Sequence, residues 1–209
     1  MSVGTSGENE AAEVCVSLSP LVEEIRACRI CADDLPMGPR PVIQVDAAAR
    51  VLIVGQAPGR RVHESGVPFD DVSGDRLRSW LGVSREVFYD PQLVAIVPMG
   101  FCFPGSGPSG DLPPRPECAP LWRTALLSEL VAVRLTLVIG QYALRWHLPD
   151  AGTSVTEAVR DWRAHWPDLV PMPHPSPRNN RWLTANPWFA DELLPELKTR
   201  VSDLLAEQA

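Results

Sequence analysis

The sequence has no apolar run that approaches the roughly 18–20 residues needed to span a bilayer. It also lacks the basic start and following apolar stretch of a secretory leader. We therefore expect a cytoplasmic protein with no membrane partner. Apolar residues make up 45% of the 209 residues, which is an ordinary share for a globular protein and excludes wholesale disorder.

Lysine is almost absent, because Lys198 is the single lysine among 19 basic residues. The formal net charge of −7 looks unfavourable for a nucleic-acid partner. The acidic excess is terminal, however, since residues 1–34 carry a net −5 and residues 191–209 a net −3. The stretch 35–190 is close to neutral and rich in arginine, the side chain that suits bidentate phosphate contacts.

Short apolar runs recur along the chain, and each ends in a turn that contains Gly or Pro. They cover 51–54, 93–97, 135–139 and 169–172, with helical patterns between them. Continuous apolar strands that alternate with helices indicate a parallel sheet covered on both faces. We predict a disordered acidic tail over residues 1–18 and one domain over residues 19–206. The predicted fold class is α/β, a single-domain three-layer sandwich with a central four-stranded parallel sheet flanked by helices.

The ends of these four runs carry unusual residues. The first run leads into Gly55–Gly59, the second into Pro98–Cys102, the third into Gly140-Gln141 and the last into His174–Pro177. Ligands of open parallel sheets bind outside the carboxyl ends of the strands. We therefore expect the active site at this edge.

Four of the five cysteines form two pairs, Cys28-x2-Cys31 and Cys102-x15-Cys118. The first spacing is typical of two thiolates on one metal or cluster. The second pair encloses a loop rich in Pro and Gly, which could bring both sulfurs to the same place. Four thiolates suit a structural zinc or a [4Fe–4S] cluster, and spacing does not choose between them. The other interpretation makes Cys102 and Cys118 small buried hydrophobes.

Three segments together resemble the uracil-DNA glycosylase superfamily, and most closely its iron–sulfur branch, the family 4 enzymes. That branch has a Gly-Glu-Ala-Pro-Gly loop, then six residues, then a Gly-x-Pro-Phe turn; here GQAPG at 55–59 precedes GVPF at 66–69 with the same gap. It also has C-x2-C and C-x15-C pairs and a His-Pro loop near the C-terminus, which match the cysteines above and His174-Pro175. The resemblance covers residues 20–200.

The resemblance implies a DNA repair enzyme of base excision, a monofunctional DNA N-glycosylase. Such an enzyme flips uracil or another deaminated base out of DNA and hydrolyses its N-glycosidic bond, leaving an abasic site. It implies DNA containing a deaminated base as the partner of a monomeric protein. It also implies a [4Fe–4S] cluster, with zinc as the alternative, held by Cys28, Cys31, Cys102 and Cys118.

Two side chains receive the central roles. His174 is expected to hydrogen-bond a base carbonyl as negative charge develops there, unless it caps the following helix. Phe69 is expected to stack on the base, unless it is a core residue. Further base contacts are assigned to Gly55, Gln56, Ala57, Gly59 and Met99, and DNA contacts to Ser73, Ser176, Arg178 and Arg181.

Several positions depart from the branch. The Glu of its first loop is Gln56, the catalytic Asp of family 1 falls on Ala57, and the family 4 acidic pair falls on Val62 and His63. The Asn that reads the base edge falls on Pro98.

The Val-Gly pair after Pro-Phe is replaced by Asp70 and Asp71. One of these carboxylates could position water or offset the charge of the sugar cation, while the other caps a helix that begins near Ser73. We favour Asp71 for catalysis and Asp70 for the cap. His63 is a further catalytic candidate.

Two other functions compete with this prediction. The loss of Asn at Pro98, together with Val62, favours a catalytically weak or inactive Fe–S protein that binds DNA or senses redox state on the same scaffold. A hypoxanthine- or xanthine-DNA glycosylase is also compatible, because Pro98 removes the reader of the pyrimidine edge and Gly59 imposes no bulky barrier.

Overall fold

The computed structural model describes residues 18–108, 110–149 and 154–206. Apart from Leu18, the predicted acidic tail lies outside the described residues. Four parallel strands form the main sheet, in the order β2-β1-β5-β6. They are β1 (Val51–Val54), β2 (Val94–Ile96), β5 (Leu135–Ile139) and β6 (Leu169–Met172). The predicted four-stranded parallel sheet is thereby confirmed.

Strand β1 lies inside the sheet, where Val51 pairs with Val94 on one side and Leu135 on the other. All four of its residues are buried. Successive side chains of a strand point to opposite faces, so Val51 and Ile53 join one apolar cluster while Leu52 and Val54 join another. Burial on both faces explains why the strand is a continuous apolar run.

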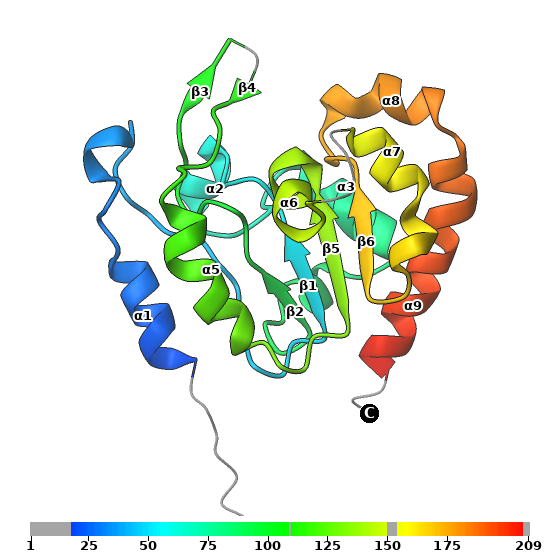
Figure 1. Cartoon of the computed structure of the whole chain (residues 1–209), viewed down its shortest axis with the longest axis horizontal. Coiled ribbons are helices and arrows are strands. Elements are labelled where there is room, and N and C mark those ends of the chain that lie inside the picture. Colours follow the sequence, from blue (N-terminus) through cyan, green and yellow to red (C-terminus); the bar gives the residue numbers. More distant parts are fainter. Residues whose placement is uncertain (1–17, 109, 150–153, 207–209) are drawn as a thin grey trace, which may run out of the picture.

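Helices cover both faces of the sheet and complete the three layers (Figure 1). One face packs against α3 (Val72–Leu81), the π-helical turn η4 (Phe189–Leu193) and α9 (Leu194–Ala206). The other packs against α1 (Ser19–Ala27), α5 (Cys118–Ser128) and α6 (Gly140–His147). No described helix is both long and apolar enough to cross a membrane.

Short elements connect these layers. The helical ones are η1 (Ala32–Asp34), α2 (Arg60–Ser65), α4 (Arg85–Phe88), α7 (Val155–Arg160), η2 (Trp162–His165), η3 (Pro177–Asn179) and α8 (Asn180–Ala185). A small antiparallel hairpin joins β3 (Ser106–Gly107) to β4 (Gly110–Asp111). The hairpin and α8 both lie at the end of the molecule toward which the strands of the sheet point (Figure 1).

Candidate functional site

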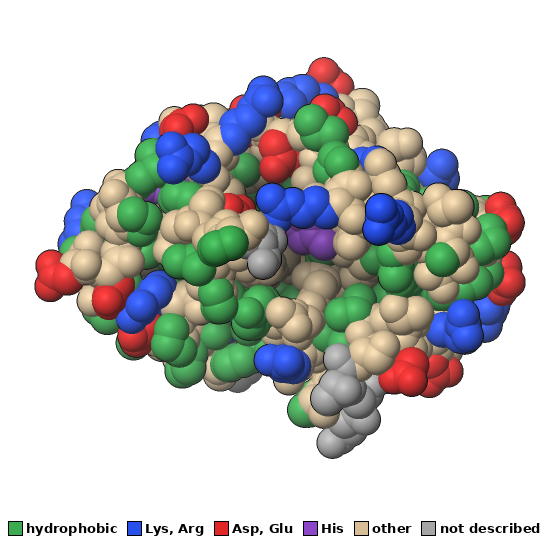
Figure 2. Space-filling view, turned by 90° about the horizontal axis from the view of Figure 1, so that it is seen from above, with side chains coloured by type: hydrophobic (Ala, Val, Ile, Leu, Met, Phe, Trp, Pro, Cys, Tyr) green, Lys and Arg blue, Asp and Glu red, His purple; other side chains and the backbone are tan. Residues whose placement is uncertain are grey.

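A cavity of about 470 Å³ opens at the carboxyl ends of the strands. Figure 2 looks onto this end of the molecule and shows a hollow that holds a histidine, with basic side chains around it. The wall combines the loop after β1, the start of α3, the hairpin and the loop after β6. The lining residues predicted from sequence are Gly55, Gln56, Ala57, Gly59, Phe69, Asp71, Ser73, His174, Ser176 and Arg178.

The loop after β1 is held to the loop after β2 by main-chain hydrogen bonds. The N–H of Met99 donates to the carbonyl of Gly55 at 2.9 Å, and the N–H of Gly100 donates to that of Gln56 at 3.0 Å. The side chain of Met99 belongs to the buried cluster packed on α1 and α5 and does not line the cavity. Met99 therefore packs in the core behind the loop after β1 instead of facing the cavity.

Phe69 stands in a left-handed backbone conformation, with φ of +53°. Such a conformation is uncommon for a bulky side chain and requires support from its surroundings. The hydroxyl of Tyr89 donates to the Phe69 carbonyl at 3.1 Å. Gly74 lies so close to that carbonyl that a Cβ there would overlap its oxygen. The ring lines the cavity and packs on the core, so both interpretations of Phe69 apply.

The neighbouring carboxylates of Asp70 and Asp71 have different surroundings. Asp71 lines the cavity and is the N-cap of α3, since its Oδ1 accepts from the N–H of Gly74 at 2.9 Å. Asp70 pairs with Arg85 at 2.9 Å, and this hydrogen bond lowers the pKa of the Asp70 carboxyl. The assignment of the helix cap to Asp70 was therefore wrong, because the residue that precedes Val72 in extended conformation is Asp71.

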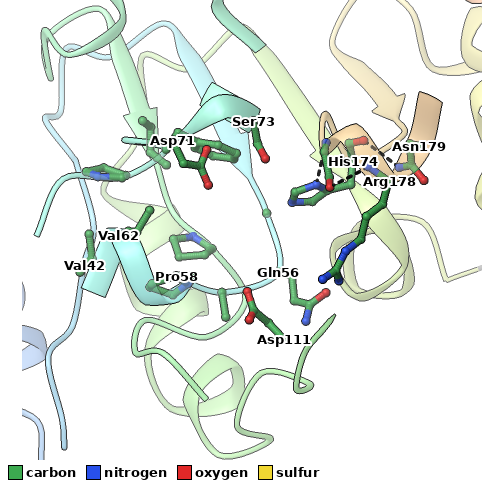
Figure 3. A pocket seen from close by; sticks show the side chains of 18 residues that line it. Val42, Gln56, Pro58, Val62, Asp71, Ser73, Asp111, His174, Arg178 and Asn179 are labelled. Carbon is green, nitrogen blue, oxygen red and sulfur yellow. Dashed lines mark hydrogen bonds between the residues drawn. The ribbon is translucent and has the colours of Figure 1, made fainter. Parts of the chain in front are cut away.

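His174 lies in the loop after β6, with its ring in the cavity (Figure 3). The N–H of Ser176 donates to its Nδ1 at 3.2 Å, which assigns the proton of a neutral ring to Nε2. Burial lowers the pKa of His174 and outweighs the carboxylates of Asp71 and Asp111, which raise it. The ring is therefore a neutral donor at neutral pH. Ser176, whose Oγ accepts from the N–H of Arg178, caps the following turn.

Contacts around this loop fix it against its neighbours. The side-chain amide of Asn179 donates to the His174 carbonyl at 2.7 Å. Arg76 of α3 donates to the carbonyl of Ser176 at 3.1 Å. Two walls of the cavity, α3 and the loop after β6, are thus tied together directly.

Asp111 was missed as a site residue. It lies at the end of the hairpin, lines the cavity and accepts a hydrogen bond from the hydroxyl of Ser106 at 2.8 Å. Figure 3 places it beside Gln56, across the cavity from Asp71. The sequence offered only a weak signal, a run of Gly, Ser and Pro that indicates a turn between Cys102 and Cys118.

Besides Met99 and Asp70, two further predicted residues lie outside the cavity. His63 is 6% exposed on α2, and its ring packs 6.1 Å from that of Phe103. Burial is the main cause that lowers the pKa of His63. Arg181 is exposed on α8 and does not line the cavity.

The four paired cysteines line a second, smaller cavity. Cys28 and Cys31 follow α1, Cys102 lies in the loop after β2, and Cys118 begins α5. All four are free thiols. Among the described residues, no group of three or more His, Cys, Asp or Glu side chains meets the geometry for holding a metal ion.

Burial and the neighbouring cysteines both raise the pKa values of Cys102 and Cys118 in this second cavity. Burial is the main cause that raises the pKa of Cys102 to about 11 and that of Cys118 to about 12. Negative charge on the other cysteines of the set raises both pKa values further. Four thiols that repel one another as thiolates are chemically suited to a soft cation or an iron–sulfur cluster among them.

Residues 42–198 match the family model described as "Uracil DNA glycosylase superfamily". The matched stretch contains the loop after β1, the turn before α3 and the His174 loop. The pair of Cys28 and Cys31 precedes it.

Proposed function

The chain belongs to the uracil DNA glycosylase superfamily, and on that premise we propose that it is a monofunctional DNA glycosylase that removes uracil or another deaminated base. The observation that carries the proposal is the cavity at the strand ends, which brings together Phe69, a neutral His174 and Asp71. A flipped base would occupy this cavity, and hydrolysis of its N-glycosidic bond would leave an abasic site in the DNA.

Base binding would rest on stacking and on the loop after β1. The aromatic face of Phe69 offers roughly 1–3 kcal/mol of stacking to a base, whatever its sequence context. The backbone of Gln56 and Ala57 borders the same space and would approach the base edge. The geometry that holds Phe69 is in place before DNA binds, so little ordering is needed at that moment.

His174 would stabilise the departing base. Cleavage of the C1′–N bond leaves its electron pair on the base, and the negative charge spreads to a carbonyl oxygen. A neutral imidazole whose proton is on Nε2 can donate a hydrogen bond to that oxygen without giving up its proton. One such donor aimed at developing charge typically contributes several kcal/mol.

Asp71 would act on the sugar. The bond cleavage leaves positive charge on the deoxyribose ring, and a carboxylate at the cavity wall offsets it. The hydrogen bond from Gly74 to Oδ1 holds this carboxylate in one orientation. Ser73, Ser176 and Arg178, which also line the cavity, are proposed to contact the DNA strand around the flipped nucleotide.

We also propose that Cys28, Cys31, Cys102 and Cys118 hold a [4Fe–4S] cluster, supported by their common cavity and their four thiol donors. When bound, it would link the end of α1, the loop after β2 and the start of α5, away from the base cavity. The purified protein is expected to carry about four irons per chain, and Cys118→Ser should lose them. Cys15→Ser, which changes a cysteine outside this set, is the control, and one zinc per colourless chain would refute the cluster.

The activity is tested with a panel of duplexes, each with one uracil, hypoxanthine, xanthine or undamaged base, followed by alkaline cleavage at abasic sites. We expect cleavage at uracil or at another deaminated base, and none in the undamaged strand. Pro98, which lines the cavity where the branch has Asn, makes the purine bases an essential part of the panel. DNA binding without cleavage of any strand would instead support a non-catalytic DNA-binding protein.

A further inference from the structure

We propose that Asp111 is a catalytic residue that orients the attacking water and accepts its proton. The proposal rests on the glycosylase function proposed above and adds a residue to it. Asp111 comes from the β3–β4 hairpin, between Cys102 and Cys118, and is not one of the residues on which the family resemblance rests. It reaches the wall of the same cavity as His174 and Asp71.

The two oxygens of the Asp111 carboxylate have different positions. Oδ1 accepts a hydrogen bond from the hydroxyl of Ser106 across the hairpin, at 2.8 Å. Oδ2 lies next to Gly59, only 3.2 Å from where a Cβ on that residue would be. The first contact orients the carboxylate, and the second places its other oxygen against the loop that forms the base-facing wall.

The backbone on both sides of Asp111 is held to the rest of the site. The side-chain amide of Gln56 donates to the carbonyl of Leu112 at 2.9 Å, and the N–H of Leu112 donates to Gly105 at 2.8 Å. On the other side, the guanidinium of Arg178 lies over Gly110, where a Cβ would be 3.2 Å from its Cζ. The hairpin is thereby seated between two walls of the cavity, and Asp111 is positioned before substrate arrives.

Asp71 and Asp111 are suited to different tasks. Oδ1 of Asp71 accepts from the N–H of Gly74 at the start of α3, which fixes an anionic oxygen at the cavity wall, where the sugar would lie. Asp111 is exposed and lines the cavity, so its carboxylate is accessible to solvent water. A water bound to Oδ2 of Asp111 could therefore approach the sugar while Asp71 offsets its charge.

Asp111 takes part in the hydrolysis of the N-glycosidic bond. The C1′–N bond breaks and its electron pair leaves with the base, whose charge His174 stabilises. The oxygen of the water forms a bond to C1′, and one water proton passes to Oδ2 of Asp111. The released base anion takes up a proton from solvent, and Asp111 returns its own, so that one water is consumed for each base released.

The first test is the single-turnover excision rate of Asp111→Asn on the best duplex of the panel. Loss of a positioned base should slow excision by about 10² or more. DNA affinity should stay equal or rise, because one negative charge near the phosphates is removed. Asp203→Asn removes the same charge from an exposed site on α9, remote from the cavity, and should keep the wild-type rate.

Chemical rescue separates catalysis from a structural role. Sodium formate should restore part of the rate to Asp111→Ala, since it supplies a mobile carboxylate, and should not raise the rate of Asp71→Ala, whose carboxylate also caps α3. Ser106→Ala keeps the Asp111 carboxylate but removes the hydrogen bond that orients it. Its excision rate should therefore fall less than that of Asp111→Asn. A slow Asp111→Ala that formate does not restore would make Asp111 structural.

The assay distinguishes a wrong role for Asp111 from a wrong glycosylase function. If the wild type excises a base and Asp111→Asn does so within about twofold of its rate, Asp111 has no catalytic role while the glycosylase stands. If the wild type excises no base of the panel, the glycosylase function fails, and the role of Asp111 fails with it.

Discussion

Replacing Gly74 by Ala should test how tightly the site holds Phe69. A Cβ at position 74 would overlap the Phe69 carbonyl oxygen and lie 2.8 Å from its carbonyl carbon and 2.9 Å from its Cβ. Carbon atoms in favourable contact are roughly 3.5–4.0 Å apart, so one of the two segments must move by the order of 1 Å.

Neither segment can move without losing a contact. A shift of Phe69 would weaken the hydrogen bond from Tyr89 to its carbonyl, and a shift of α3 would weaken the cap between Asp71 and the N–H of Gly74. Overpacking of this kind typically costs about 1–3 kcal/mol of folding free energy. A misplacement of about 1 Å in a catalytic site can also lower the rate by about 10².

The assay measures thermal unfolding and single-turnover excision for Gly74→Ala beside Ser79→Ala, an exposed position on the same helix. We expect a lower Tm and a rate reduced by about 10² for Gly74→Ala, and neither change for Ser79→Ala. A Gly74→Ala protein with the wild-type Tm and rate would refute the reasoning that Phe69 is held rigidly by α3.

The remaining predictions concern charge. Burial, and then Arg123, lowers the pKa of His147 to about 4, against 6.5 for an unperturbed histidine. The folded protein should therefore lose about 3 kcal/mol of stability as the pH falls from about 6.5 to about 4, and urea unfolding of the wild type and His147→Gln would measure it. Asp71→Asn should keep the helix cap but excise about 10²-fold more slowly, in a single-turnover assay. Asp70→Asn should excise at the wild-type rate, because its carboxylate pairs with Arg85 outside the cavity.

The sheet was predictable because both of its faces are buried. Val51–Val54 and Leu135–Ile139 lie between two helical layers, so nearly every position is apolar and the strands stand out as runs. The edge of the sheet that carries the site was predictable for a related reason, since the carboxyl ends of parallel strands all lie at the same edge. Gly55, Phe69 and His174 follow different elements and still line one cavity.

Other features of the site depend on contacts between segments distant in the sequence, which no local sequence pattern encodes. The hairpin strands have only two residues each, too few for any periodicity. Asp111 reaches the cavity in a hairpin that Gln56 binds at the carbonyl of Leu112 and over which Arg178 lies, at Gly110. The left-handed turn at Phe69 decides that Asp71, rather than Asp70, precedes α3 in the extended conformation of a cap. Met99 follows a strand exit, yet its side chain turns into the core.

The central claim is that a neutral His174 stabilises the leaving base in the cavity. The most direct measurement is the single-turnover rate of His174→Ala on the duplex that the wild type excises, with DNA affinity measured on the same duplex and His165→Ala as control. The predicted result is a rate lower by about 10²–10³ with little change in affinity. An unchanged rate, or a loss of affinity alone, would contradict the claim.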